Sequence, residues 1–136
     1  MSRENVEIVN RVLDTLRFAT VQEMTDEVLA DGFDPHVEWL PVVHGPLIVE
    51  WYTGYEGIRQ FYTAFLATWE EVRAHPEAFR DAGDQVATTL RMTGRRDDAP
   101  CDERWSVLWT IKNHRITRVE GFASPSGASQ AVGLEE

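Results

Sequence analysis

The chain has 136 residues, of which 43% are hydrophobic and 26% charged, and its formal net charge is −10. This length and composition predict one soluble domain that can bury a core of its own. The acidic balance argues against nucleic-acid binding, since phosphate recognition usually needs a basic face. No apolar run is long enough to predict a membrane span.

The cellular location is predicted from the N-terminus and the cysteine content. The opening residues MSRENVEIVNRVL lack the basic start and apolar centre of a signal peptide. Cys101 is the single cysteine, so no disulfide can form within the chain. Both features favour the reducing cytoplasm. We also expect no cofactor and no metal, because the four histidines are scattered and no glycine-rich phosphate loop precedes a helix.

Helical periodicity dominates the first part of the chain. Apolar residues from Ile8 to Leu16 fall on one stripe, which predicts a helix over about 3–17. The sequence TVQE at 20–23 has the form of a capping box and begins a short second helix. Gly32 would end that helix in the left-handed conformation, and a strand is predicted over 36–42.

The middle of the chain combines an apolar loop with an aromatic helix. The loop from Pro41 to Gly54 is rich in apolar residues, which is typical of a lid or an interface. TGYE at 53–56 is a second capping-box pattern. Apolar residues then recur at helical spacing as far as Val72, and Pro76 is expected to stop this helix.

The second half changes from helical spacing to strict alternation. Residues 86–93 and 101–112 alternate between two faces, and a last strand is predicted over about 115–123. Turns are expected at 83–84 and at 113–114, where Asn113 tolerates a positive φ, and GRR at 94–96 reads as a solvated hairpin tip. Helices followed by an antiparallel meander predict the α+β class.

Five segments of the chain resemble the SnoaL-like family of the nuclear-transport-factor-two-like, or ketosteroid isomerase-like, superfamily. They are SRENVEIVNRVLDTL, DPHVEW, GYEGIRQFY, DAGDQV and WTIKNHRITRVEGF, in the family's order. The resemblance implies an α+β fold with a curved antiparallel or mixed sheet wrapped around three helices, forming a cone with an open-ended pocket. It also implies a cone-fold domain over 1–124, a partly flexible tail over 125–136, and a homodimer.

The superfamily hosts several chemistries, so the resemblance leaves the reaction open. Laid onto this chain, the isomerase base falls on Trp39, the first-helix tyrosine on Val12, and the acidic donor near Trp105 or Ser106. A valine or a tryptophan can neither abstract a proton nor donate to an enolate at those points, and no aspartate stands at 105 or 106, which argues against that mechanism. The epoxide-hydrolase pattern also fails, because Ser106 stands where an aspartate should follow Arg104.

Acidic candidates for a cyclase-type reaction match the family pattern poorly. The candidate acids are Glu38, Glu50, Glu103 and Glu120. For the aspartate that the epoxide-hydrolase pattern needs on the last strand, the chain offers Glu120 or Gly121, depending on the register. The catalytic candidates are therefore Tyr62, His44 and Glu120. His44 could act as a base over the pocket mouth or could be a solvent-exposed loop residue.

The predicted ligand-binding residues are mostly aromatic and lie on the helix and strands that would face the pocket. They are Trp39, Phe61, Tyr62, Arg91, Trp105 and Trp109. Each has a structural alternative: Tyr62 as a core tyrosine bonded to backbone or water, the tryptophans as sheet packing, and Arg91 and Arg104 in ion pairs with Glu103, Glu120 or Asp102.

The sequence predicts a protein that binds a small, mostly apolar molecule in an aromatic-lined pocket. One alternative is an isomerase-, cyclase- or hydrolase-type enzyme acting on a small cyclic substrate, and another is a non-catalytic dimerisation module. A hollow of roughly 300 Å3 or more with converging polar groups would favour ligand binding. An interior filled by Trp39, Phe61 and Trp105 would favour the structural role.

Overall fold

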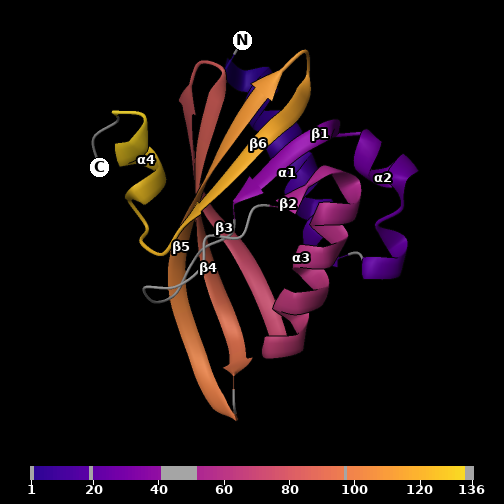
Figure 1. The fold of residues 1–136 in the computed structure, drawn as a ribbon. Coiled ribbons are helices and arrows are strands. Elements are labelled where there is room, and N and C mark those ends of the chain that lie inside the picture. The colour runs from indigo at the N-terminus through magenta and orange to yellow at the C-terminus, as the bar shows by residue number, and fades with distance from the viewer. Residues whose placement is uncertain (1, 19, 41–51, 97, 134–136) are drawn as a thin grey trace.

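The computed structural model describes residues 2–18, 20–40, 52–96 and 98–133. Within these ranges the protein is an α+β fold with four α-helices, one 3-10 turn and a six-stranded sheet (Figure 1). The helical elements are α1 (Ser2–Phe18), η1 (Val21–Glu23), α2 (Asp26–Ala30), α3 (Gly54–Thr68) and α4 (Gly127–Ala131). The strands are β1 (Phe33–Leu40), β2 (Tyr52–Thr53), β3 (Glu70–Ala82), β4 (Gln85–Arg96), β5 (Ala99–Lys112) and β6 (Arg115–Phe122).

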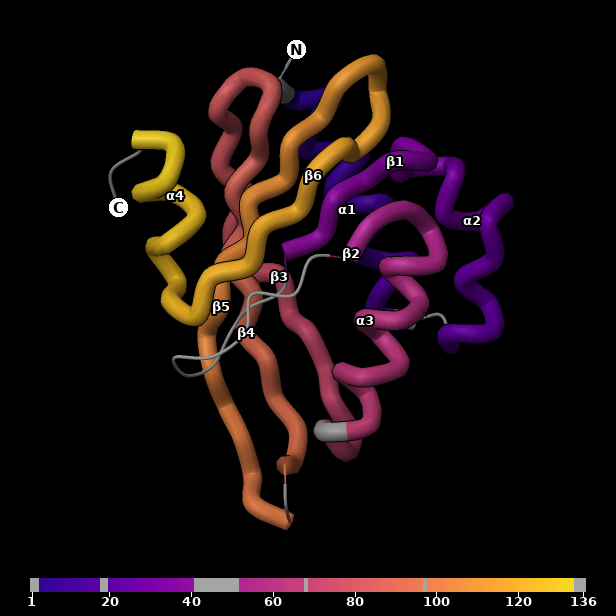
Figure 2. The backbone as a smooth tube through the Cα atoms, in the orientation of Figure 1, coloured from indigo at the N-terminus to yellow at the C-terminus, as the bar shows by residue number. Residues whose placement is uncertain are grey.

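The sheet is curved, unclosed and mixed, with the strand order β2-β1-β6-β5-β4-β3. All neighbouring strands run antiparallel except β1 and β6, which are parallel. Helices α1, α2 and α3 lie on one side of the sheet, and α4 lies on the other side beside β5 and β6 (Figure 2). The expected α+β fold, a curved mixed sheet around three helices, is confirmed.

The first helix agrees with its prediction, whereas the second divides into two. Thr20 and Glu23 form the expected capping box, but the box starts only the 3-10 turn η1. The side chain of Thr25 then accepts a hydrogen bond from the Val28 backbone N–H and starts α2 as a separate helix. Two capping threonines five residues apart therefore replace one continuous helix.

Gly32 is required for a reason other than the one predicted. Its φ lies outside the left-handed region, so the expected left-handed helix end is wrong. A Cβ at this position would instead collide with Cγ2 of Val12. Gly32 therefore lets α1 pack directly on the chain segment that leads into β1.

The third helix ends earlier than its periodicity predicts. It stops at Thr68, and Trp69 is already extended with φ −117° and ψ 140°. The residues from Glu70 onward form β3, which pairs with β4 as far as Ala82 and is bulged on both sides of residues 73–76. Strand pairing thus overrides the local helical spacing. Pro76 fits because β3 is an edge strand of this sheet.

The N-terminus of α3 also differs from its prediction. Thr53 forms no side-chain capping hydrogen bond, so the capping box expected at 53–56 is wrong. Thr53 and Tyr52 instead pair with Glu38 and Trp39 as the short strand β2. The apolar loop predicted over 41–54 lies mostly outside the described residues.

The hairpins of the second half are confirmed. Turns occur at 83–84 and at 113–114, and both Asn113 and His114 have positive φ values, 53° and 66°. The strand predicted over 36–42 begins earlier, at Phe33. Part of the segment at 125–136 forms α4, which is held by Ser106: its Oγ accepts from the Ala128 N–H (2.9 Å) and donates to the Ser124 carbonyl (2.7 Å).

None of the described helices is long and apolar enough to cross a membrane. The main core lies between the sheet and helices α1 to α3, and a smaller cluster of Ala87, Leu108 and Ala128 lies beneath α4. The strands β4 and β5 thus have a buried residue layer on each face.

We predict that Gly32→Ala lowers the free energy of unfolding by about 1–3 kcal/mol, because the new methyl overpacks the contact with Val12. Urea denaturation followed by circular dichroism measures the loss. Val12→Ala removes the opposing methyls, so the glycine substitution should cost less in that background. Equal costs in both backgrounds would contradict the packing explanation.

Candidate functional site: an aromatic cavity

A cavity of about 320 Å3 lies between the sheet and the helices α1 and α3. Its volume is at the lower end of the range for small-molecule sites, about 300–1,000 Å3. Aliphatic residues of α1, β3 and β4 contribute to the wall, but aromatic rings form most of it. These are Trp39, Phe61, Tyr62, Phe65, Trp69, Trp105 and Trp109.

Helix α3 supplies three rings from one face. Phe61 and Phe65 are one helical turn apart and stack, with centroids 5.6 Å apart and planes at 21°. Tyr62 lies beside both, at 5.1 Å from Phe61 and 6.1 Å from Phe65. Trp69 follows the end of the helix and contacts Phe65 at 5.9 Å. The helix that sequence periodicity identified therefore does wall a cavity.

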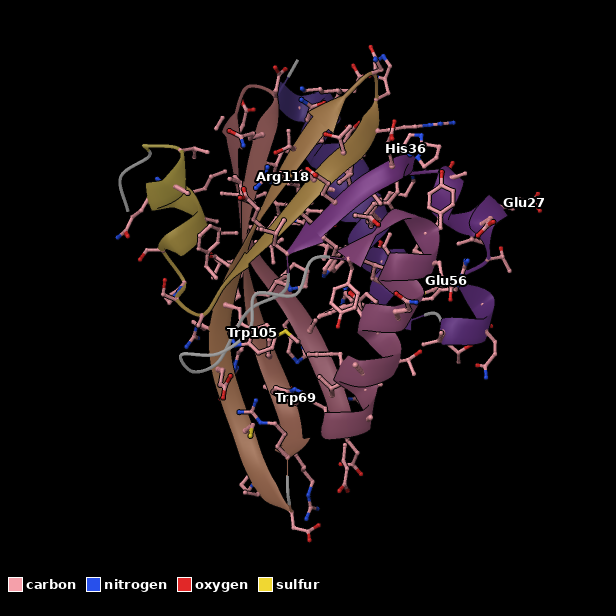
Figure 3. The ribbon with its side chains drawn as sticks, viewed as in Figure 1. Glu27, His36, Glu56, Trp69, Trp105 and Arg118 are labelled. Carbon is pink, nitrogen blue, oxygen red and sulfur yellow. The ribbon has the colours of Figure 1, made fainter. Side chains whose placement is uncertain are left out.

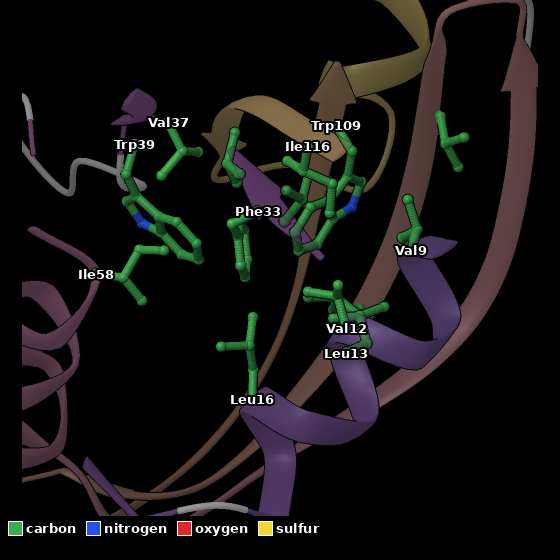
Figure 4. Close-up of a cluster of buried hydrophobic side chains, with 14 of the residues drawn as sticks. Val9, Val12, Leu13, Leu16, Phe33, Val37, Trp39, Ile58, Trp109 and Ile116 are labelled. Atoms are coloured by element: carbon green, nitrogen blue, oxygen red, sulfur yellow. The ribbon is translucent and has the colours of Figure 1, made fainter. Parts of the chain in front are cut away.

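The sheet supplies the opposite wall. Trp39 of β1 meets Phe61 at 5.3 Å and Tyr62 at 5.8 Å, and stands perpendicular to Trp109 of β5 at 6.4 Å. Figure 4 shows Trp39 and Trp109 projecting into the same interior. Trp105, four residues earlier on β5, contacts both Phe65 and Trp69 at 6.0 Å.

Two of the indole rings are fixed by hydrogen bonds of their own. Trp109 Nε1 donates to Thr88 Oγ1 at 3.0 Å, in a part of the core where Thr88 is 1% exposed. Trp105 Nε1 donates to Glu103 Oε1 at 2.9 Å. A buried indole N–H usually needs such an acceptor. The ring positions are therefore set before any ligand arrives.

Tyr62 is a neutral polar residue of the cavity wall. It is half-buried and lines the cavity, and within the described ranges its hydroxyl makes no hydrogen bond. Burial raises the pKa of the hydroxyl above its ordinary value of 10.0. Tyr62 therefore stays protonated near neutral pH and can donate a hydrogen bond, but it cannot serve as a base there.

The charged residues that line the cavity, within the described part of the chain, are Arg17 and Arg96. The guanidinium of Arg96 lies 4.7 Å from the centroid of Trp69, and its Nη2 is 2.6 Å from Glu103 Oε2. Trp69 and Trp105 mark this end of the cavity (Figure 3). Glu103 thus connects Arg96 to the indole of Trp105.

The structure brings five of the six predicted ligand-binding residues together but not Arg91. Arg91 points to the outer face of the sheet, where Nε and Nη2 contact Asp102 at 3.0 and 2.6 Å. The alternative of ion pairing with Asp102 is thus confirmed for Arg91. Arg104 pairs with Glu77 at 2.8 Å, which is none of the three partners considered.

The other candidate residues also lie away from the cavity or outside the described ranges. Glu120 faces the outer side of β6, 3.3 Å from Arg118, whereas its neighbour Gly121 lines the cavity. Ser106 also points outward, to α4. His44 lies outside the described residues. Among the described residues that line the cavity, there is no aspartate or glutamate.

Several cavity residues were not predicted from the sequence. Trp69 was assigned to the helix, and Arg96 to a solvated hairpin tip. Strand alternation could have identified Arg96, because it has the same parity in β4 as the inward-facing Met92. No local signal identifies Gly121. In the described part of the chain, no group of three His, Cys, Asp or Glu side chains is arranged to hold a metal ion.

The fold is that of the nuclear-transport-factor-two-like proteins. Within that class the chain belongs to the SnoaL-like domain family, whose profile matches residues 12–119. No curated protein matches the sequence. The family assignment made from the five sequence segments is therefore confirmed.

Solved structures of the same fold have low sequence identity to this chain. TerC, co-crystallised with polyporic acid, has a TM-score of 0.73 at 18% identity, covering 95% of this chain and 98% of TerC. A protein of Jannaschia sp. CCS1, provisionally named a SnoaL-like polyketide cyclase, has a TM-score of 0.74 at 17% identity, covering 99% and 95%. A ketosteroid isomerase-like protein of Catenulispora acidiphila DSM 44928, in complex with trimethylamine, has a TM-score of 0.70 at 19% identity, covering 95% and 94%.

We predict that Thr88→Val lowers the free energy of unfolding by about 1–3 kcal/mol, because it leaves the buried Trp109 N–H without its acceptor. Urea denaturation measures the change. Thr89→Val is the matched control, since its hydroxyl bonds the Pro125 carbonyl on the other face of the same strand. Equal losses for the two variants would show that the bond to Trp109 has no special weight.

Proposed function

We propose that this protein binds a small, flat and mostly apolar molecule in the aromatic cavity. The observation that carries the proposal is a ring-lined space of about 320 Å3 into which the Tyr62 hydroxyl brings an unused hydrogen-bond donor. The proposed ligand has an aromatic or other planar ring system and one oxygen acceptor. Its rings would pack against the indoles of Trp39, Trp105 and Trp109.

The arrangement of the rings supports specific binding. Each ring is in contact with at least one other ring, and two indoles are also hydrogen bonded. Little side-chain entropy is then lost when a ligand enters, which is an important part of affinity. Ring contacts of this kind contribute about 0.5–1.5 kcal/mol each beyond area burial.

Binding without demonstrated chemistry is favoured over the isomerase, cyclase and hydrolase alternatives. By the family resemblance, Trp39 falls where the isomerases have their base, and the described cavity wall has no carboxylate. The protonated phenol of Tyr62 could polarise a ligand carbonyl but could not accept a proton from it. The likeness to a provisionally named polyketide cyclase, at 17% identity, supports the shared fold alone.

The dimerisation-module alternative has less support, because the aromatic rings surround an interior space instead of forming an exposed face. A homodimer that also binds a ligand remains compatible with this function and stays a prediction, which sedimentation equilibrium would test.

The single cysteine favours a cytoplasmic location for the protein.

The proposal predicts that 2-acetylnaphthalene binds, since it has two fused rings and one carbonyl acceptor. Tyr62→Phe should weaken its binding about 3- to 10-fold, which corresponds to the loss of one neutral hydrogen bond. Binding of 2-ethylnaphthalene, which has no oxygen, should be unchanged. Isothermal titration calorimetry measures both affinities.

Tyr55→Phe is the matched control, because the Tyr55 hydroxyl bonds the Phe33 carbonyl at 2.9 Å and does not line the cavity. Two results would contradict the proposal. In the first, wild-type protein binds neither naphthalene below about 1 mM. In the second, Tyr62→Phe affects the two compounds equally.

The affinity for 2-acetylnaphthalene is predicted to be constant between about pH 6 and pH 9. Burial raises the pKa of Tyr62 above 10.0, so the donor keeps its proton over this whole interval and is lost only above it. Calorimetric titrations at several pH values measure this. A decline of more than about threefold below pH 9 would mean that Tyr62 ionises earlier or is not the donor.

A further inference from the structure

We infer that Arg96 makes the cavity selective for aromatic acids, with the guanidinium receiving the carboxylate of the ligand. This inference rests on the proposed function and adds the chemical class of the ligand. It arises from the placement of charge around the cavity, which differs in sign from the charge of the whole protein.

Arg96 is held in a fixed position at the cavity wall. It lies at the end of β4, its guanidinium stacks on Trp69, and its Nη2 contacts Glu103. The other oxygen of Glu103 accepts from the Trp105 indole, so the carboxylate is itself fixed at both ends. The guanidinium is therefore oriented before a ligand arrives.

Glu103 does not use all the hydrogen-bonding capacity of Arg96. A guanidinium carries five N–H donors, and the bond to Glu103 is made through Nη2. Within the described ranges, the side chain of Cys101 is a second hydrogen-bond partner of Arg96, which leaves further N–H donors of the guanidinium for a ligand. A planar group with several free donors suits a second carboxylate better than it suits a neutral carbonyl.

Two arginines, each paired with a carboxylate, belong to the cavity wall. Arg17 and Arg96 line the cavity, whereas their carboxylate partners Asp14 and Glu103 do not. In each pair, the member that lines the cavity is thus the arginine. A cationic ligand would be repelled there, and an anionic one would be attracted more strongly than in water because the surrounding rings lower the local dielectric constant.

The surface next to the cavity extends this positive region. A shallow hollow shares Arg17, Val72 and Ala74 with the cavity wall and is also lined by Arg73 and Arg95. The other titratable residues on its wall are Glu71 and His75. The protein as a whole has a net charge of −10, whereas among the described residues of this hollow the arginines Arg17, Arg73 and Arg95 outnumber the carboxylate of Glu71. Such a field attracts anions and repels cations.

The experiment compares 2-naphthoate with 2-acetylnaphthalene, which share the same two rings and differ in the charge of the oxygen group. Wild-type protein is expected to bind 2-naphthoate at least about tenfold more tightly, since hydrogen bonds to charged groups exceed neutral ones by about that factor. Arg96→Met should remove this preference, because it should weaken the binding of 2-naphthoate at least about tenfold more than the binding of 2-acetylnaphthalene. Isothermal titration calorimetry measures all affinities.

Two further variants separate recognition from folding. Arg91→Met removes an arginine from the outer face of the same strand and should preserve the preference for 2-naphthoate. Arg96→Gln keeps polar contacts but removes the charge, and it replaces Arg96→Met if the latter unfolds in circular dichroism. It should lose the preference as well.

The inference is wrong if wild-type protein binds the two compounds equally, or if removing the charge at residue 96 weakens both to the same extent. The second result would mean that Arg96 only supports Trp69. In both cases binding of 2-acetylnaphthalene would still support the proposed cavity function. If neither compound bound the wild-type protein, the proposed function would fail together with the inference.

Discussion

Contacts between aromatic rings connect helix α3 to the sheet across the interior. Trp39 meets Tyr62 at 69° and Trp109 at 90°, and Trp69 meets Trp105 at 85°. Edge-to-face contact is a favourable arrangement of aromatic rings, so these pairs connect the aromatic face of α3 to the sheet. The same rings line the cavity, and Arg96 lies at its wall beside Trp69.

On the outer face of the sheet, two ion pairs offset the repulsion between two neighbouring arginines. Arg91 and Arg104 lie directly opposite each other in the register of β4 and β5, where like charges are unfavourable. Asp102 and Glu77 each pair with one of them. Exposed ion pairs contribute only about 0–1 kcal/mol, so their main effect is to cancel the repulsion. The register of β4 and β5 is then compatible with two arginines on the outer face.

The sequence predicted the fold well because alternation and turn residues act locally. The alternation of residues along β5 correctly placed Trp105 and Trp109 on one face. Asn113 and His114 correctly indicated the turn of the last hairpin. The sequence-based prediction failed where contacts between distant residues decide the structure. Residues with helical spacing pair with β4 as part of β3, and the need for glycine at position 32 comes from its contact with Val12. A cavity is a space between elements, so no single segment encodes it.

Alternate residues of strand β5 contact different parts of the structure. Trp105, Val107 and Trp109 face the cavity, while Ser106 and Leu108, the residues between them, hold α4 on the opposite side. Odd-numbered positions can therefore change without disturbing the even-numbered ones. A lineage could acquire a new small-molecule preference through a few substitutions on one side of this ribbon, while the other side continued to maintain the architecture.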